Sequence, residues 1–208
     1  MQTEFGLIDA EGYAQLHDRY APLTAAVRDL VDASLKTGVD ADTIGAATAA
    51  VEAVTEMLRR NQQQTPRLRR EDTGRPVVWS NPVVGERNPL APPLEVRHDP
   101  DGRYRSEFTL GSVYEGPPGL VHGGISALVL DHLLGEVASS GLTRPMFTGT
   151  ITLRYLRGTP LGALHAEGFI DRREDHKIYA RGFIGDAQGP TVEAEGVFIM
   201  PAWARTTE

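Results

Sequence analysis

The chain has 208 residues and a formal net charge of -7, from 28 acidic and 21 basic side chains. A general nucleic-acid binder is usually basic, so this class is disfavoured. The absence of cysteine excludes thiol nucleophiles, disulfides, iron–sulfur clusters and cysteine-ligated zinc, and it fits the reducing cytoplasm that we expect as the location. Residues 1–10 lack the basic cluster and apolar core of a secretory signal. The longest largely apolar run, residues 125–130, is far too short to cross a bilayer.

Two helices are predicted in the first part of the chain. Between Leu16 and Leu35 apolar side chains recur mostly every three or four residues, which is the spacing of one helix face. Gly38 is expected to end this helix, and Asp40 or Asp42 to cap a second helix that continues to Leu58. We interpret the pair as a helical hairpin that packs on the main domain or on a partner chain. A lid over a substrate tunnel is the alternative.

A polar and proline-rich stretch follows these helices. Residues 62–75 are polar and basic and are expected to form a linker, and the five prolines within residues 76–93 exclude a continuous central strand. Residues 77–79 are expected to form at most a short edge strand. We therefore divide the chain into a helical extension with its linker, residues 1–75, and a main domain, residues 76–203.

The main domain alternates strands with one helix. Two strands, residues 94–98 and 103–110, flank a turn signal, and a helix is predicted from about residue 122 to 140. Four strand-like runs follow, separated by short turns that favour antiparallel hairpins in a meander: residues 147–157, 164–173, 177–185 and 191–200.

The predicted helix in the main domain is apolar on every side. Such a helix is buried rather than amphipathic. A sheet of six strands wrapped around it accounts for the whole segment, so we expect an α+β protein with the hot-dog arrangement, in which an antiparallel sheet surrounds a central buried helix. The N-terminal helices form an extension to this domain.

Asp131 places a carboxylate inside this apolar helix. Burial raises the pKa of an aspartate, and a raised pKa suits a general base. A salt bridge, or a bond to a backbone group, is the structural alternative.

The sequence His122-Gly123-Gly124 stands where the helix begins. Free backbone N–H groups point outward at a helix N-terminus, where the helix dipole favours negative charge, and glycine lets a ligand approach these groups closely. The site therefore suits the oxyanion of a polarised carbonyl. The alternative is that the two glycines only permit a tight turn and close packing of helix on sheet.

The spacing of these two features constrains any shared chemistry. Gly123 and Asp131 are eight residues apart, which is roughly 12 Å along a helix at about 1.5 Å per residue. One carbonyl group does not reach both residues of the same helix. If both take part, Asp131 comes from a second copy of the chain, and the sequence predicts an active site at a dimer interface.

At this point the chain resembles the hot-dog acyl-CoA thioesterases, in particular the phenylacetate-pathway thioesterases and the mammalian thioesterase superfamily members 4 and 5. The resemblance covers about residues 76–201. Its motifs are the segment 114–124, which ends in His-Gly-Gly, the Asp nine residues after that His, and Phe-Thr at 147–148 followed by the strand at 151–155.

The resemblance implies a role for each of these residues. Gly123 would supply an oxyanion N–H, with help from Gly124, and Asp131 of the opposite subunit would act as general base or nucleophile. Thr148 would help to hold the attacking water; as a β-former it is also an ordinary strand residue. His122 would orient the thioester or the loop, or simply satisfy the helix start.

The sequence departs from the resemblance at one position. Relatives of the phenylacetate type often carry an asparagine six residues before the histidine, where this chain has Gly116. Any role of that asparagine is therefore missing or moved, which favours the mammalian-like subgroup.

The sequence predicts a homo-oligomeric acyl-CoA thioesterase that forms a carboxylic acid and CoA, with no metal and no cofactor other than the CoA of its substrate. The alternatives are a non-catalytic acyl-CoA or lipid-binding module, and an assembly protein that uses its N-terminal helices. The following basic residues would either meet the CoA phosphates or lie on solvated strand faces: Arg154, Arg157, Arg172, Arg173, His176 and Lys177.

Overall fold

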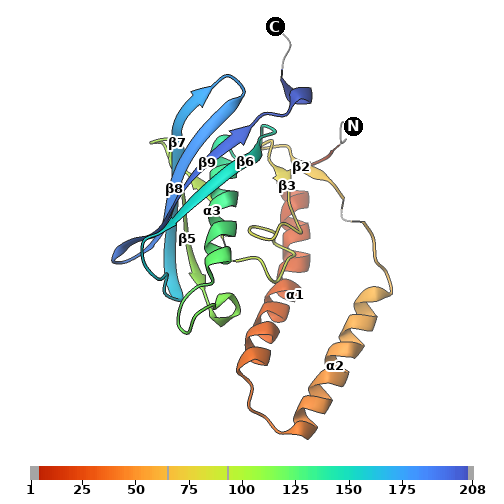
Figure 1. Cartoon of the computed structure of the whole chain (residues 1–208). Coiled ribbons are helices and arrows are strands. Elements are labelled where there is room, and N and C mark those ends of the chain that lie inside the picture. The colour runs from red at the N-terminus through yellow and green to blue at the C-terminus, as the bar shows by residue number, and fades with distance from the viewer. Residues whose placement is uncertain (1–4, 65, 93, 206–208) are drawn as a thin grey trace.

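The computed structural model describes residues 5–64, 66–92 and 94–205. A six-stranded antiparallel sheet packs around the helix α3 (Gly123–Ala138), and the N-terminal helices α1 (Ala10–Lys36) and α2 (Ala41–Arg59) lie on the other side of α3 (Figure 1). The α+β arrangement with a central helix is confirmed. Of residues 1–10, for which no secretory signal is expected, the first four lie outside the described residues.

The core lies between α3 and the sheet. Five large side chains of α3 are essentially inaccessible to solvent: Val129, Leu130, Leu133, Leu134 and Val137. Two glycines on neighbouring strands, Gly168 and Gly182, are paired opposite each other beneath this helix. A Cβ atom at either position would come within 3.0–3.1 Å of α3 side chains, so the glycines let the sheet approach the helix closely.

The strands follow the predicted positions within a few residues. The short strand β4 comes first, and the 3-10 helix η1 (Ser112–Tyr114) lies between β5 and α3. The six strands are β4 (Arg97–His98), β5 (Tyr104–Leu110), β6 (Phe147–Tyr155), β7 (Gly162–Glu174), β8 (Lys177–Asp186) and β9 (Gly189–Ile199).

The predicted meander of the last four strands is wrong at its first turn. The sheet order is β4-β5-β7-β8-β9-β6, so β6 pairs with β9 rather than with β7. The connection after β6 is not a hairpin turn because its backbone is bonded elsewhere: Leu156 N donates to Thr191 O at 2.8 Å, and Val121 N donates to Thr159 O at 2.8 Å. The chain thus crosses the end of the sheet, which leaves β6 as an edge strand.

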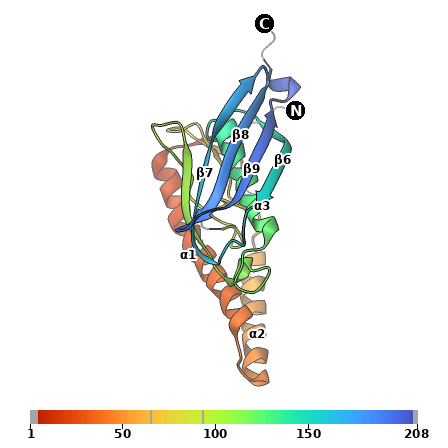
Figure 2. The ribbon, with the colours of Figure 1, turned by 60° about the vertical axis from the view of Figure 1, so that its left-hand side comes forward.

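The two N-terminal helices are confirmed, but among the described residues only α1 packs closely against the main domain. Asp9 and Asp40 cap the two helices with their side chains. Tyr13 of α1 stacks on Trp79 at 5.9 Å between ring centroids, and Asp32 accepts a hydrogen bond from Ser112 at 2.8 Å. No residue of α2 is buried, and Figures 1 and 2 show α2 extending away from the sheet.

A small second sheet ties the start of the chain to the segment expected as a linker. The strands β1 (Gly6–Ile8), β2 (Leu68–Arg70) and β3 (Pro76–Val77) lie in the order β1-β2-β3. Residues 62–75 are therefore not a simple linker, because β2 pairs with strands on both sides. The expected boundary after residue 75 falls inside this sheet, and the division into two domains stays a prediction.

Candidate active site

The loop before α3 is a closed turn that fixes the start of the helix. His122 N donates to the carbonyl oxygen of Tyr114 at 2.8 Å, which joins the two ends of the loop. Within the loop, the Glu115 carboxylate accepts from Gly119 N at 2.5 Å. Gly119 has a φ of 75°, a left-handed conformation that favours glycine.

His122 is the N-cap of α3. Its φ of -60° and ψ of 131° lie outside the helical region, and its Nδ1 accepts a hydrogen bond from Gly124 N at 3.0 Å. A neutral imidazole that accepts at Nδ1 carries its proton on Nε2. The Gly124 N–H is thus used within the turn, whereas Gly123 stands at the first helical position, where the helix offers no acceptor for the N–H. The geometry therefore favours Gly123 over Gly124 as a donor to an oxyanion.

Asp131 and Thr148 lie together although they come from different elements. Thr148 Oγ1 donates to Asp131 Oδ1 at 2.8 Å. The register of β6 shifts between Thr148 and Thr150, and such a bulge turns a side chain out of the regular alternation. Gly149 lies at this bulge, where a Cβ atom would come within 2.8 Å of Ile199 Cδ1. Asp131 is half-buried in the single chain, less than its place in an apolar helix predicts.

The candidate residues form two groups that lie along one edge of the molecule. Asp131 and Thr148 lie near the start of β6, and at its end Tyr155 donates from its hydroxyl to Gly123 O at 2.9 Å. α3 is one continuous helix, so Gly123 and Asp131 are separated by about 12 Å along its axis. One chain therefore presents two half-sites rather than one complete site.

Comparisons with known proteins show the family of the chain but do not test the roles of these residues. A family model described as the thioesterase superfamily matches residues 118–193. The crystal structure of protein RHA08564, described as a thioesterase superfamily protein, is 35% identical, with a TM-score of 0.75 over 86% of this chain and 90% of that chain. The chain belongs to the thioesterase superfamily.

Two further likenesses are more limited. The human acyl-coenzyme A thioesterase THEM5 is 33% identical over 99 residues, which are 45% of this chain and only 38% of that protein. A phenylacetic acid degradation-related protein from Ralstonia eutropha JMP134 is 19% identical over 52% of this chain and 85% of that chain. Its TM-score is 0.44, so it is given only as a similar protein.

The structure gives a steric reason for glycine at position 116. A Cβ atom at Gly116 would lie 2.8 Å from His122 Cα and 3.1 Å from His122 Cβ. The loop therefore closes directly on His122, and an asparagine side chain has no room in this loop conformation.

We expect Gly116→Ala to destabilise the protein by about 1 to 3 kcal/mol, because the new methyl group must push the backbone of His122 away. Gly111→Ala is the matched control, since a Cβ at Gly111 has no atom within 4 Å. Urea unfolding followed by circular dichroism measures both variants. Equal stabilities would show that the loop relaxes without cost.

One buried charged cluster on α3 was missed by sequence reasoning. Glu136 is 1% exposed, and its carboxylate accepts from Arg75 at 2.6 Å and lies 3.1 Å from His132 Nε2. The available signal was a glutamate four residues after a histidine in an apolar helix. The partner Arg75 is 61 residues away in sequence and was not predictable from this spacing.

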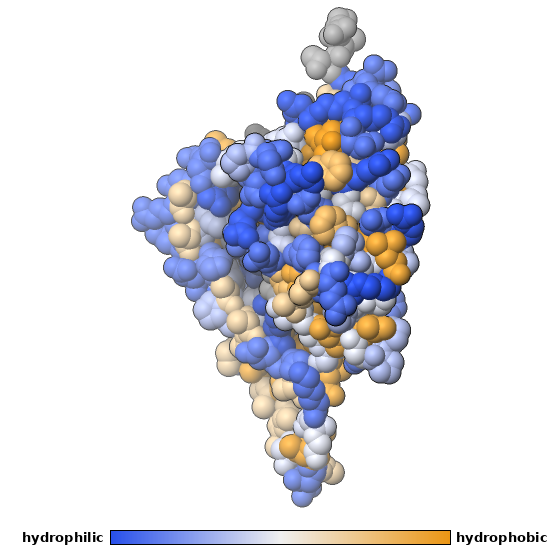
Figure 3. All heavy atoms as spheres, turned by 90° about the vertical axis from the view of Figure 1, so that its left-hand side faces the viewer, coloured by the Kyte–Doolittle hydropathy of each residue, from blue (hydrophilic) through white to orange (hydrophobic). Residues whose placement is uncertain are grey.

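Three of the six basic residues named for the strand region pair with acids. Arg154 pairs with Glu193, and Arg172 donates to Glu174 at 2.8 Å. The Arg157 guanidinium lowers the pKa of Asp186 to about 2 by hydrogen bonding to its carboxylate. Figure 3 shows hydrophilic residues with apolar groups between them on this outer face of the sheet. These contacts favour the interpretation as solvated strand faces for the three arginines.

The search for metal ligands and membrane spans covers the described residues only. Within residues 5–64, 66–92 and 94–205, no group of three or more His, Cys, Asp or Glu side chains could hold a metal ion. In the same part of the chain, no helix has the length and apolar character needed to cross a membrane.

Proposed function

We propose that this chain is an acyl-CoA thioesterase, which hydrolyses a thioester to a carboxylic acid and CoA. The observation that carries the proposal is the Thr148–Asp131 pair on the same molecular edge as the helix start at Gly123. Membership of the thioesterase superfamily and the likeness to THEM5 support acyl-CoA as the substrate class.

A dimer through β6 would complete the site. β6 forms an edge of the sheet, and this edge exposes large apolar side chains at Phe147, Tyr155 and Leu156. If two copies pair their β6 strands antiparallel about a two-fold axis, the start of one strand faces the end of the other. Asp131 of the partner subunit then approaches Gly123, and the roughly 12 Å gap within one chain is no longer an obstacle.

The proposed reaction uses a donor and a carboxylate from different subunits. The Gly123 N–H donates to the thioester oxygen as negative charge develops there. Asp131 of the partner subunit takes a proton from water positioned with Thr148, and the water oxygen bonds to the carbonyl carbon. The carbon–sulfur bond then breaks, and the CoA thiolate leaves and takes up a proton. Direct attack by the Asp131 carboxylate is the other route consistent with these groups.

The test is release of free CoA thiol from a panel of acyl-CoA substrates that includes short, long and aromatic acyl groups. We expect at least one member to be turned over catalytically. Saturable binding of acyl-CoA with no thiol released from any member would instead favour the non-catalytic binding module.

Two further expectations belong to this proposal. We expect residues 76–203 to form the thioesterase domain that carries out the reaction. Residues 1–75 form the helical extension and its linker. The lack of cysteine supports a reducing cytoplasm as the place where the protein works.

A further inference from the structure

The helix α2 carries a row of apolar side chains that no other described part of the chain covers. The row consists of Ile44, Ala47, Val51, Val54 and Leu58, at alternating spacings of three and four residues. Its four larger side chains are each between 41% and 49% exposed, and Ala47 is exposed as well. Apolar side chains at this spacing form the seam along which two helices pack at a crossing angle of about 20°. The row therefore indicates a second helix as its partner.

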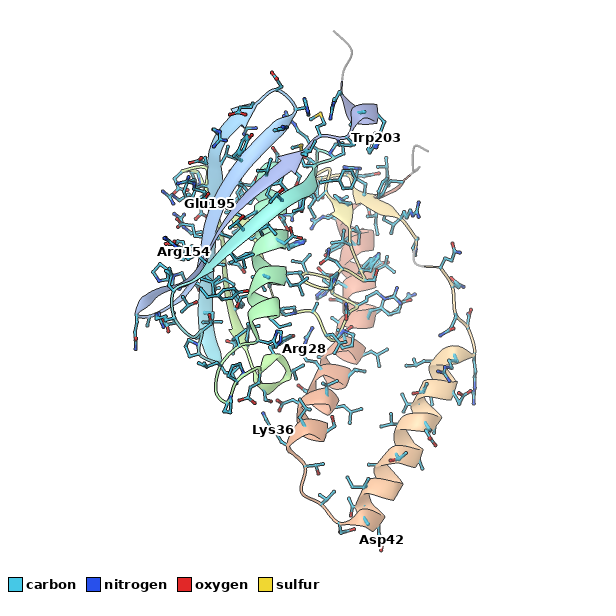
Figure 4. The ribbon with its side chains drawn as sticks, viewed as in Figure 1. Arg28, Lys36, Asp42, Arg154, Glu195 and Trp203 are labelled. Atoms are coloured by element: carbon cyan, nitrogen blue, oxygen red, sulfur yellow. The ribbon has the colours of Figure 1, made fainter. Side chains whose placement is uncertain are left out.

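Among the described residues, no helix lies along this row. Figures 1 and 4 show α2 standing apart from α1, with Asp42 at the tip of the hairpin and far from the sheet. The exposed large apolar side chains of α1, Leu23, Leu30 and Leu35, are seven and five residues apart, which is too sparse to match the row. Helices in proteins gain most of their stability from packing of an apolar face. α2 therefore needs a partner from outside the chain.

The row is symmetric about Val51. Ile44 and Leu58 each lie seven residues from it, and Ala47 and Val54 lie four and three residues from it. If two copies of α2 pack antiparallel about a two-fold axis at Val51, Ile44 of one copy faces Leu58 of the other, and Val51 faces its own equivalent. A helix face that matches itself in this way fits a second copy of the same chain.

The charges at the two ends of α2 favour the antiparallel direction. The N-terminal end carries Asp40 and Asp42, and the C-terminal end carries Arg59 and Arg60, with Glu56 paired to Arg59. Both glutamates of α2 lie outside the row. In an antiparallel pair the acidic end of each helix lies beside the basic end of the other, and the helix dipoles oppose each other. A parallel pair would instead place the two acidic ends together.

We propose that α2 pairs antiparallel with α2 of a second copy of this chain. The pair buries the apolar row of both copies and joins two chains through a surface that contains none of the candidate catalytic residues. This surface is separate from the β6 edge, because α2 and β6 are different elements with no close contact between them. The pairing of α2 does not depend on the proposed hydrolysis or on pairing through β6, and it would stand if those proposals failed.

The test uses the absence of cysteine, because one introduced cysteine is then the only thiol of the chain. In Val51→Cys protein the two thiols meet at the two-fold axis, where packed helices bring facing Cα atoms within disulfide range. Ala49→Cys is the matched control, since Ala49 is also exposed on α2 but two residues away, on a different side of the helix. We expect Val51→Cys to form a covalent dimer about 100-fold faster, because the pair holds its thiols at high effective concentration. Oxidation of dilute protein, followed on a non-reducing gel, measures both rates.

Two further variants determine the direction of the pair. In an antiparallel pair, Ile44→Cys and Leu58→Cys form covalent dimers only when the two proteins are mixed and their subunits exchange. Each variant alone should stay uncrosslinked, because its two thiols are then separated by about 21 Å along the helix axis. A parallel pair would give the opposite pattern, with a covalent dimer in each variant alone.

Two results would overturn the proposal: equal oxidation rates for Val51→Cys and Ala49→Cys, or covalent dimers from Ile44→Cys alone but not from its mixture with Leu58→Cys. If the row is instead covered by α1 of the same chain or by a different protein, purified Val51→Cys shows no rapid covalent dimer. If Val51→Cys does not fold, the mixture of the other two variants still decides. Because no thioester is present in these reactions, their outcome is separate from that of the hydrolysis assay.

Discussion

Asp131→Asn is expected to lower kcat for the best acyl-CoA substrate by about 100-fold to 10,000-fold, the range for losing a general acid or base. The amide oxygen of asparagine can still accept from Thr148, so the fold and the contact at β6 are retained. Steady-state thiol release and thermal unfolding of both proteins measure the effect. Equal rates for the two proteins would show that Asp131 takes no part in catalysis.

Gly123→Pro tests the other half-site, and the Tyr155 ring must give way by a few tenths of an ångström, because a Cβ at Gly123 would lie 3.3 Å from it. Proline removes the N–H but is well tolerated at the first helical position. The φ of -60° and ψ of 131° at His122 also suit a residue that precedes proline. We expect a loss of about 100-fold to 1,000-fold in kcat, as for removal of one oxyanion donor. Gly135→Ala, on the same helix with no atom closer than 3.7 Å to the new Cβ, should leave kcat unchanged.

Mixing the two inactive variants distinguishes a shared site from a site within one chain. A heterodimer of Asp131→Asn and Gly123→Pro contains one site with both native groups if each site draws on two subunits. After exchange of subunits in equal amounts, about a quarter of the wild-type activity should return, since about half of the dimers are mixed and each has one intact site. A mixture that stays inactive after confirmed subunit exchange would mean that the two groups do not share a site across the interface.

The sequence predicts well those features that depend on neighbouring residues. The apolar run of α3, the cap at His122 and the strands around it follow from local periodicity and turn chemistry. The position of Asp131 along α3 also follows, because a residue's place on a helix is determined by its distance in sequence from the helix start. Its partner Thr148 came from the resemblance, since the bulge at Gly149 depends on how β6 pairs with β9.

Features that depend on distant contacts were not predictable in this way. The stretch between β6 and β7 has the composition of a hairpin turn, but hydrogen bonds to Thr191 and to the loop before α3 hold it in a crossing connection. The three-residue strands β1 and β2 are too short to show alternation, and they exist because the two segments pair. The contact between Arg75 and Glu136 joins parts of the chain that have no local relation.

Loss of the ion pair between Arg75 and Glu136 is expected to have the second large effect, on stability. Arg75→Met is expected to destabilise the protein by about 3 kcal/mol, because it strands the buried Glu136 carboxylate with only His132 beside it. We expect the lower end of the usual range since Arg75 is itself 37% exposed. Urea unfolding monitored by circular dichroism gives the free energy of unfolding. A control is Arg59→Met on α2, whose exposed pair with Glu56 should contribute less than about 1 kcal/mol.

The double variant Arg75→Met with Glu136→Met separates the cost of an unpaired charge from the value of the pair. Replacing a buried pair by apolar side chains of similar volume is often neutral, so the double variant should regain most of the lost stability. If Arg75→Met costs no more than Arg59→Met, the ion pair does not stabilise the fold. His132 contacts Glu136 and directly follows Asp131, so the ion pair could affect the position of Asp131. Measuring thiol release by the stable double variant tests this. Wild-type kcat would make the ion pair structural, whereas a lowered kcat with native stability would show that it positions Asp131.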